Sequence, residues 1–231
     1  PDALPPFRPF TARGGETSVV WLTLYAPPGI PAGVYTGPIE MSTGGGERYA
    51  FQLEARVFDF ELPIVPTLKT DFGFWQEGAL QWCRQLGYQG SESALAAAYM
   101  NNALAHRVTL RQPAQLPAES ADYANDLKAF DLRFKELTAR GATTFSVPAS
   151  LLDTPAQLKL ANEFVVSHKL QGRAFCQIAD EPGSPSWPRL SERMQQWQTA
   201  APDIPMMVTT TGLEAFLPDL GRIWAVHLQM L

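Results

Sequence analysis

Short apolar stretches separated by turn residues mark the first quarter of the chain. Residues 17–27, 33–43 and 48–63 alternate or cluster β-branched and aromatic side chains, as half-buried strands do. The segments PGIPAG and GGGE between them are rich in the residues that form turns. The pattern predicts a small antiparallel β-sandwich over residues 1–64.

From residue 68 the pattern changes to short apolar strands that alternate with helical stretches. This alternation is the signature of βα units on a parallel sheet, and eight such units close a barrel. The expected strands cover 68–75, 107–111, 143–148, 173–179, 205–211 and 222–230, and the expected helices cover 91–105, 122–139, 155–168 and 188–200.

The sixth expected strand is followed almost at once by Leu231, the last residue. We therefore expect a multi-domain β plus α/β chain in which residues 68–231 form the first six units of a (β/α)₈ TIM-type barrel whose C-terminal part is missing. An atypical barrel that closes with fewer elements is the alternative.

Charge and composition exclude several classes of partner. The chain has 18 Lys and Arg against 23 Asp and Glu, a formal net charge of −5 without long runs of either sign, so nucleic acid is not an expected partner. No apolar run reaches the roughly 18–20 residues of a membrane span. Cys83 and Cys176 lie far apart without a metal-ligand spacing, and no nucleotide, zinc-protease or serine-hydrolase motif occurs, so neither a metal nor a cofactor is expected.

The stretch RAFCQIADEPGSP carries the strongest candidate chemistry. Asp180 and Glu181 follow an apolar strand, and active sites on βα folds lie at the C-terminal ends of the strands. Adjacent residues of a regular strand point to opposite faces, but Pro182 and Gly183 interrupt the strand and allow both carboxylates to reach one ligand. A solvated loop before a helix is the alternative interpretation.

Three further side chains are candidates for substrate binding. Trp75 follows the first expected strand and Trp187 lies six residues after Glu181, and an aromatic ring can pack against the C–H face of a sugar. Arg111 ends the second expected strand, where it can bind a hydroxyl group or pair with an acid. Ordinary core packing for the two rings and a salt bridge at the rim for Arg111 are the competing interpretations.

Several motifs together resemble the family-123 glycoside hydrolases and their relatives. They are the Pro-x-Gly-x-Tyr-x-Gly hairpin at residues 31–37, the LP…P.LKT.FG junction at residues 62–73, and the strand that ends in IADEP. The resemblance implies a β-sandwich before a (β/α)₈ barrel, a retaining β-N-acetylgalactosaminidase with Asp180 and Glu181 as its acid pair, and an extracellular or periplasmic location.

Adjacent carboxylates suit one particular mechanism. Retaining glycosidases with two independent carboxylates separate them by roughly 5–5.5 Å and commonly take them from different strands. If the 2-acetamido oxygen of the substrate is the nucleophile, Asp180 orients the acetamido group and Glu181 protonates the leaving oxygen. A glycan-binding module without catalysis, and a glycosidase that pairs Glu181 with an acid from a later strand, are the other two hypotheses. The sequence does not indicate an oligomeric state.

Overall fold

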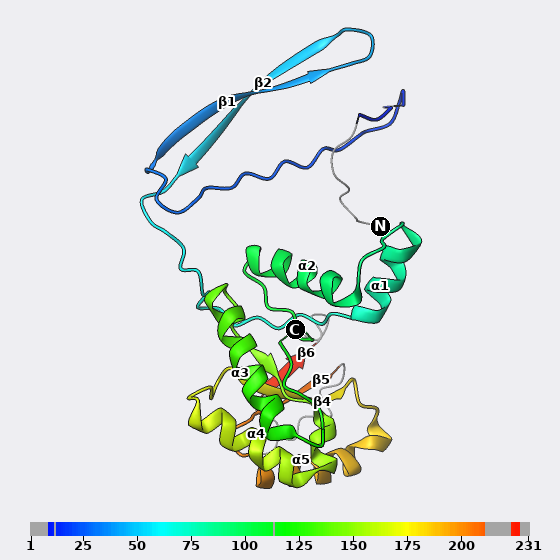
Figure 1. Ribbon diagram of the computed structural model, residues 1–231. Coiled ribbons are helices and arrows are strands. Elements are labelled where there is room, and N and C mark those ends of the chain that lie inside the picture. Colours follow the sequence, from blue (N-terminus) through cyan, green and yellow to red (C-terminus); the bar gives the residue numbers. More distant parts are fainter. Residues whose placement is uncertain (1–8, 12, 113, 211–222, 227–231) are drawn as a thin grey trace. The chain divides into compact units, whose positions relative to one another are not determined.

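The computed structural model describes residues 9–11, 13–112, 114–210 and 223–226 of the 231-residue chain (Figure 1). The chain divides into two units, residues 1–62 and 63–231, close to the junction expected at 64–68. Within the described residues, no helix is both long enough and apolar enough to cross a membrane.

The described residues of the first unit contain a single hairpin. Strands β1 (Gly33–Ser42) and β2 (Arg48–Val57) pair antiparallel over their full length, with Gly33 opposite Val57. The expected strand at 17–27 has no pairing partner, and no described residue of the unit is buried. The prediction of a β-sandwich is therefore wrong, because a sandwich needs a second sheet to enclose an apolar layer, and the described part of this unit has only two strands.

The second unit is built on a parallel sheet. Its order is β3 (Phe145–Ser146), β4 (Ala174–Asp180), β5 (Met206–Thr210) and β6 (Ile223–Val226), and all neighbouring pairs are parallel. The helices are α1 (Gln76–Gln85), α2 (Glu92–Ala105), α3 (Tyr123–Ala139), α4 (Pro155–Ser167) and α5 (Trp187–Ala200), with short 3-10 turns η1 (Ala149–Asp153) and η2 (Ser184–Ser186). Helix α4 connects β3 to β4 and helix α5 connects β4 to β5, as expected for βα units.

The predicted barrel is also wrong. The expected strands at 68–75 and 107–111 are extended segments joined by one isolated parallel bridge, Phe72 to Leu110, and the sheet of the described residues is open with four strands. A second bridge, Gln115 to Ser146, connects the chain after these segments to β3. Part of the sixth expected strand, residues 222 and 227–230, lies outside the described residues.

Threonine side chains replace the missing ladder between the extended segments and β3. The amide of Thr70 donates to Oγ1 of Thr143 at 3.0 Å, the amide of Thr143 donates to Oγ1 of Thr109 at 2.9 Å, and the amide of Thr109 donates to Oγ1 of Thr70 at 2.9 Å. These three bonds form a closed cycle, which we call the threonine cycle. Buried backbone N–H groups need partners, and here hydroxyl groups supply them.

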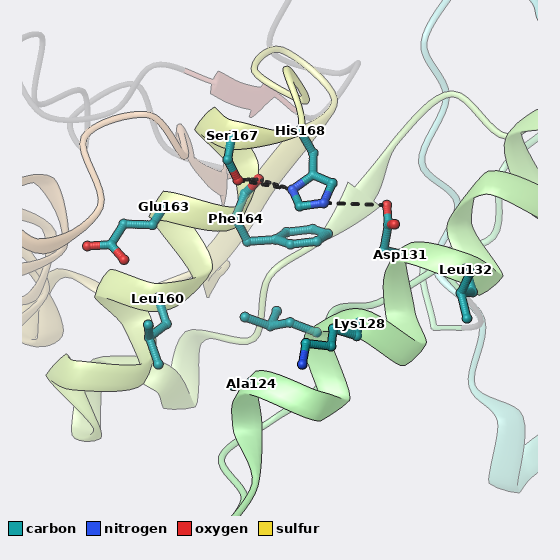
Figure 2. Close-up of a pocket in the computed structure, with 10 residues that line it drawn as sticks. Ala124, Lys128, Asp131, Leu132, Leu160, Glu163, Phe164, Ser167 and His168 are labelled. Carbon is teal, nitrogen blue, oxygen red and sulfur yellow. Dashed lines mark hydrogen bonds and ion pairs between the residues drawn. The ribbon is translucent and has the colours of Figure 1, made fainter.

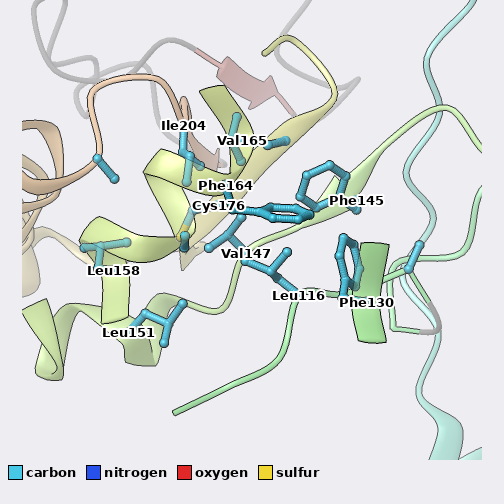
Figure 3. Close-up of a cluster of buried hydrophobic side chains, with 14 of the residues drawn as sticks. Leu116, Phe130, Phe145, Val147, Leu151, Leu158, Phe164, Val165, Cys176 and Ile204 are labelled. Atoms are coloured by element: carbon cyan, nitrogen blue, oxygen red, sulfur yellow. The ribbon is translucent and has the colours of Figure 1, made fainter. Parts of the chain in front are cut away.

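The hydrophobic core lies between the sheet and helices α3, α4 and α5 (Figures 1 and 3). Alternate strand residues such as Phe145, Val147 and Cys176 face these helices and meet rings such as Phe130 and Phe164. The side chains between them, including Ser146 and Gln177, therefore lie on the opposite face of the sheet. That opposite face, which we call the polar face, carries the candidate chemistry.

Local sequence explains where the helices begin and end. Ser91 caps α2 by accepting a hydrogen bond from the amide of Ala94 at 3.2 Å, and Pro155 occupies the first turn of α4. After α3, Gly141 has a φ of 111°, and a Cβ at this position would lie 2.9 Å from the carbonyl oxygen of Ile64. The four helices predicted from the sequence are confirmed within two residues at each end, whereas α1 was not predicted.

Candidate functional site

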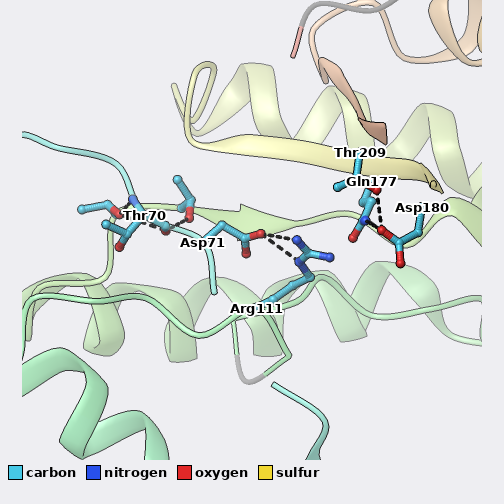
Figure 4. Close-up of polar contacts among 8 residues, drawn as sticks. Thr70, Asp71, Arg111, Gln177, Asp180 and Thr209 are labelled. Atoms are coloured by element: carbon cyan, nitrogen blue, oxygen red, sulfur yellow. Dashed lines mark hydrogen bonds and ion pairs between the residues drawn. The ribbon is translucent and has the colours of Figure 1, made fainter. Parts of the chain in front are cut away.

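Asp180 is held in place by two neighbours at the carboxyl end of β4 (Figure 4). Nε2 of Gln177 donates to its Oδ1 at 3.0 Å, and the Thr209 hydroxyl donates to the same oxygen. The register shifts between Gln177 and Ala179, so two residues of β4 oppose one of β5 and Gln177 and Asp180 come to lie on the same face. Both donors bind Oδ1, so Oδ2 is the oxygen that can accept a hydrogen bond from a ligand.

Glu181 has an unusual backbone conformation. Its φ is 43°, in the left-handed region that non-glycine residues adopt at a cost. Two other described non-glycine residues have positive φ, Arg107 and Lys169, and they follow the ends of α2 and α4, where such a conformation is common. Glu181 instead directly follows a strand, so the chain turns sharply at this residue.

Thr209 stabilises this turn from the neighbouring strand. The Glu181 amide donates to the Thr209 carbonyl oxygen at 3.1 Å and to its Oγ1 at 3.0 Å. The same hydroxyl donates to Asp180, so one side chain of β5 orients both acidic residues. The two carboxylate-bearing residues are exposed, which makes them accessible to a ligand.

We expect Thr209→Val to lower the free energy of unfolding by about 1–3 kcal/mol, because it removes a hydroxyl that binds a charged group. Thr209→Ser keeps the hydroxyl and is the matched control. Chemical denaturation of both variants measures the difference, and amide hydrogen exchange at Glu181 should accelerate only in the valine variant. Equal stability of the two variants would contradict the bonding described for Thr209.

Arg111 forms an ion pair with Asp71. Its Nε and Nη2 lie 2.8 and 2.5 Å from Oδ2 of Asp71, and both side chains are largely buried. The Arg111 guanidinium carbon is 5.8 Å from the centre of the Phe175 ring on β4, so the side chain extends over the polar face of the sheet (Figure 4). The sequence predicted a site role for Arg111 and did not single out Asp71.

The two candidate tryptophans have different surroundings in the structure. Trp75 precedes α1, is 72% exposed, and lies against its own first turn, where a Cβ on Gly78 would be 2.3 Å from the ring. Trp187 begins α5 and packs partly against the hydrophobic core. An exposed ring such as Trp75 is able to stack on a ligand, and a binding role for the partly buried Trp187 stays a prediction.

Gln177, Thr209 and Asp71 are the polar site residues that sequence reasoning missed. Each lies within an extended segment or strand of the second unit, and Thr209 is next to the carboxyl end of β5. Their partners are set by the strand register and by an irregularity in β4, and neither can be read from residue patterns.

Cys176, the cysteine on the strand that carries Asp180, has an unreactive thiol. Cys176 lies on the helix side of β4, and burial raises the pKa of its thiol well above the ordinary value, although the positive charges of Arg193 and Arg111 act in the opposite direction. A thiol that stays protonated is a poor nucleophile and a poor metal ligand.

A separate groove of about 580 Å³ lies between α3 and α4 (Figure 2). Phe164 and Leu160 contribute apolar surface, and Asp131, 4.0 Å from Nε2 of His168, contributes a polar edge. His168 follows α4 and precedes β4, so it lies towards the amino ends of the strands. The groove is therefore distinct from the acid pair at the carboxyl ends.

Among the residues that the structure describes, no group of three or more His, Cys, Asp or Glu side chains is arranged to hold a metal ion. No protein-family model and no curated protein matches the chain. The arrangement of Asp180, Glu181 and their neighbours is thus the basis on which a function is assigned.

Proposed function

We propose that the protein is a glycoside hydrolase that removes a terminal β-linked N-acetylhexosamine, with N-acetylgalactosamine the favoured sugar. The observation that carries the proposal is the turn at Asp180 and Glu181, in which the Thr209 hydroxyl binds both residues at the carboxyl end of a parallel strand. Ligands of open α/β sheets bind at these carboxyl ends. The motifs that resemble the family-123 glycoside hydrolases favour this sugar.

The reaction proceeds in two steps. The substrate's acetamido oxygen attacks the anomeric carbon while the glycosidic C–O bond breaks and Glu181 gives its proton to the leaving oxygen. Water then attacks the anomeric carbon of the cyclic intermediate, Glu181 takes a proton from that water, and the acetamido group is restored. Two inversions at one carbon give net retention.

Asp180 acts on the acetamido group in both steps. A carboxylate oxygen that accepts the acetamido N–H orients the internal nucleophile and stabilises the positive charge that develops on it. Oδ1 is occupied by Gln177 and Thr209, so Oδ2 is the oxygen suited to this task. Immobilisation of Oδ1 restricts the rotation of the carboxylate and favours one substrate orientation.

A comparison of two substrates tests this proposal. We expect an aryl β-N-acetylgalactosaminide to be hydrolysed with a kcat/KM at least about 10³-fold above that of the matching 2-hydroxy galactoside, because only the first carries a well-placed internal nucleophile. Comparable hydrolysis of both would identify a glycosidase with a second carboxylate instead. Binding of the sugar without hydrolysis of either would identify a glycan-binding module.

A further inference from the structure

The polar face carries a second feature that the proposed reaction does not use, the ion pair of Asp71 and Arg111. Both Nε and Nη2 of Arg111 converge on a single oxygen, Oδ2 of Asp71. Arginine–carboxylate pairs frequently align in parallel, with two N–H groups that bind the two different oxygens. This pair therefore retains unused hydrogen-bonding capacity on each side.

Two buried atoms of this face have no hydrogen-bond partner among the described residues. They are Oδ1 of Asp71 and the hydroxyl oxygen of Ser146. Ser146 is only 4% exposed. Buried polar groups without partners lower stability, so proteins retain few of them, and those that remain often mark functional sites. Both atoms thus point to a ligand as the missing partner.

Strand register places these groups together. Ser146 pairs with Phe175 across β3 and β4, and the Arg111 guanidinium carbon lies 5.8 Å from the Phe175 ring. Gln177 is two residues further along β4, on the same face, and it binds Asp180. The ion pair and the acid pair are therefore two parts of one polar surface.

The charges of this surface restrict the ligand. Among the described charged residues Asp71, Arg111, Asp180 and Glu181, Arg111 is the only cation; Asp71 compensates its charge, and the other two add two more carboxylates. A sulfate or carboxylate on the ligand would meet net negative charge. A neutral hydroxyl group can accept a hydrogen bond from the guanidinium and donate one to a carboxylate oxygen at the same time.

We propose that Asp71 and Arg111 form a subsite that binds neighbouring hydroxyl groups of an uncharged sugar ring, next to the acid pair. Arg111 donates its remaining N–H groups to the sugar, and a small rotation of its guanidinium opens Oδ1 of Asp71 to a sugar hydroxyl. Asp71 also positions Arg111, and the Phe175 ring supports the guanidinium from below. This inference rests on the proposed function, because it takes the ligand to be the sugar that the acid pair acts on.

Calorimetric titration with N-acetylgalactosamine and its 3-, 4- and 6-deoxy analogues tests the subsite. The double variant Asp71→Asn/Arg111→Gln removes both charges together, which avoids leaving one buried charge unpaired. We expect it to bind the parent sugar about 10- to 100-fold more weakly than the unmodified protein, as expected for loss of a hydrogen bond to a charged group. At least one deoxy analogue should bind both proteins with nearly equal affinity, because it lacks the hydroxyl that the pair contacts.

Further variants separate the subsite from general damage to the fold. Arg111→Lys keeps the charge and loses the planar fork, so it should lose affinity for the same hydroxyl. Arg84→Gln removes an exposed charge on α1 and should leave all affinities unchanged. Circular dichroism confirms that each variant is folded, and N-acetylgalactosamine 6-sulfate should bind the unmodified protein more weakly than the parent sugar does.

The outcomes distinguish the subsite from the proposed hydrolysis. An equal loss of affinity for the parent sugar and all deoxy analogues in the double variant overturns the subsite, and so does the absence of any sugar binding. Selective loss in a protein that hydrolyses nothing supports the subsite and refutes the hydrolase. Hydrolysis with an unchanged KM in the double variant refutes the subsite and leaves the hydrolase standing.

Discussion

Glu181→Gln is expected to lower kcat/KM for a natural glycoside by about 10²- to 10⁴-fold, the usual effect of losing a general acid. The same variant should keep nearly full kcat/KM on an aryl glycoside with a good leaving group. This constant reports the steps through departure of the leaving group, and an aryl oxide leaves without help from a proton. Steady-state kinetics on the two substrates measures the contrast.

Asp180→Asn is the matched variant for this experiment. Orientation of the acetamido group precedes departure of any leaving group, so this variant should lose activity on both substrates by similar factors. Asn keeps the shape of the side chain and can still accept a hydrogen bond from Gln177 or Thr209. If Glu181→Gln instead impairs both substrates equally, Glu181 is not the general acid and the substrate-assisted scheme is wrong.

Trp197→Ala is expected to have the largest effect on stability, a loss of about 3–5 kcal/mol of unfolding free energy. Trp197 on α5 is completely buried, and its Nε1 donates to the carbonyl oxygen of Ile204 at 3.0 Å, just before β5. Truncation leaves a large cavity and an unpaired carbonyl group. A fall in melting temperature of about 10 °C should accompany it.

Trp82→Ala provides the control for this measurement. Trp82 lies on α1 and is 61% exposed, so its truncation should change stability by no more than about 0.5 kcal/mol. Thermal unfolding followed by circular dichroism compares the two variants. A similar loss in both would show that Trp197 does not contribute to the core in the way its burial indicates.

Helices could be predicted from the sequence because each has its own local signals. The helix that begins after Ser91 combines a capping side chain with apolar residues at helical spacing, and α4 begins with a proline. The first helix was missed because Gly78 and the aromatic residues around it resemble the end of a strand. Local signals therefore defined the helices better than they defined the sheet.

Strands were predicted less well because a strand depends on a partner elsewhere in the chain. Residues 17–27 have the composition of a strand but lack a partner among the described residues, and the alternating pattern of the hairpin does not show whether a second sheet covers it. The segment at 68–75 pairs at one position only, since Thr70 uses its hydroxyl and amide in side-chain contacts.

The candidate site shows the same division between local and long-range information. Asp180 and Glu181 could be located because they follow an apolar strand and precede Pro182 and Gly183. The hydrogen bonds of these two residues to Thr209 could not be predicted, since they depend on a register shift in β4 and on a residue of β5 that is 29 positions from Asp180. The role proposed for Asp71 depends likewise on a partner 40 residues away.

The threonine cycle has a consequence for how the protein opens. Its bonds join residues that are 34, 39 and 73 positions apart, and each hydroxyl accepts an amide from a different segment. Release of any one segment breaks two of the three bonds, so the segments separate as a group. The amides of Thr70, Thr109 and Thr143 should therefore exchange with solvent at similar rates, because all three become exposed in the same local opening event.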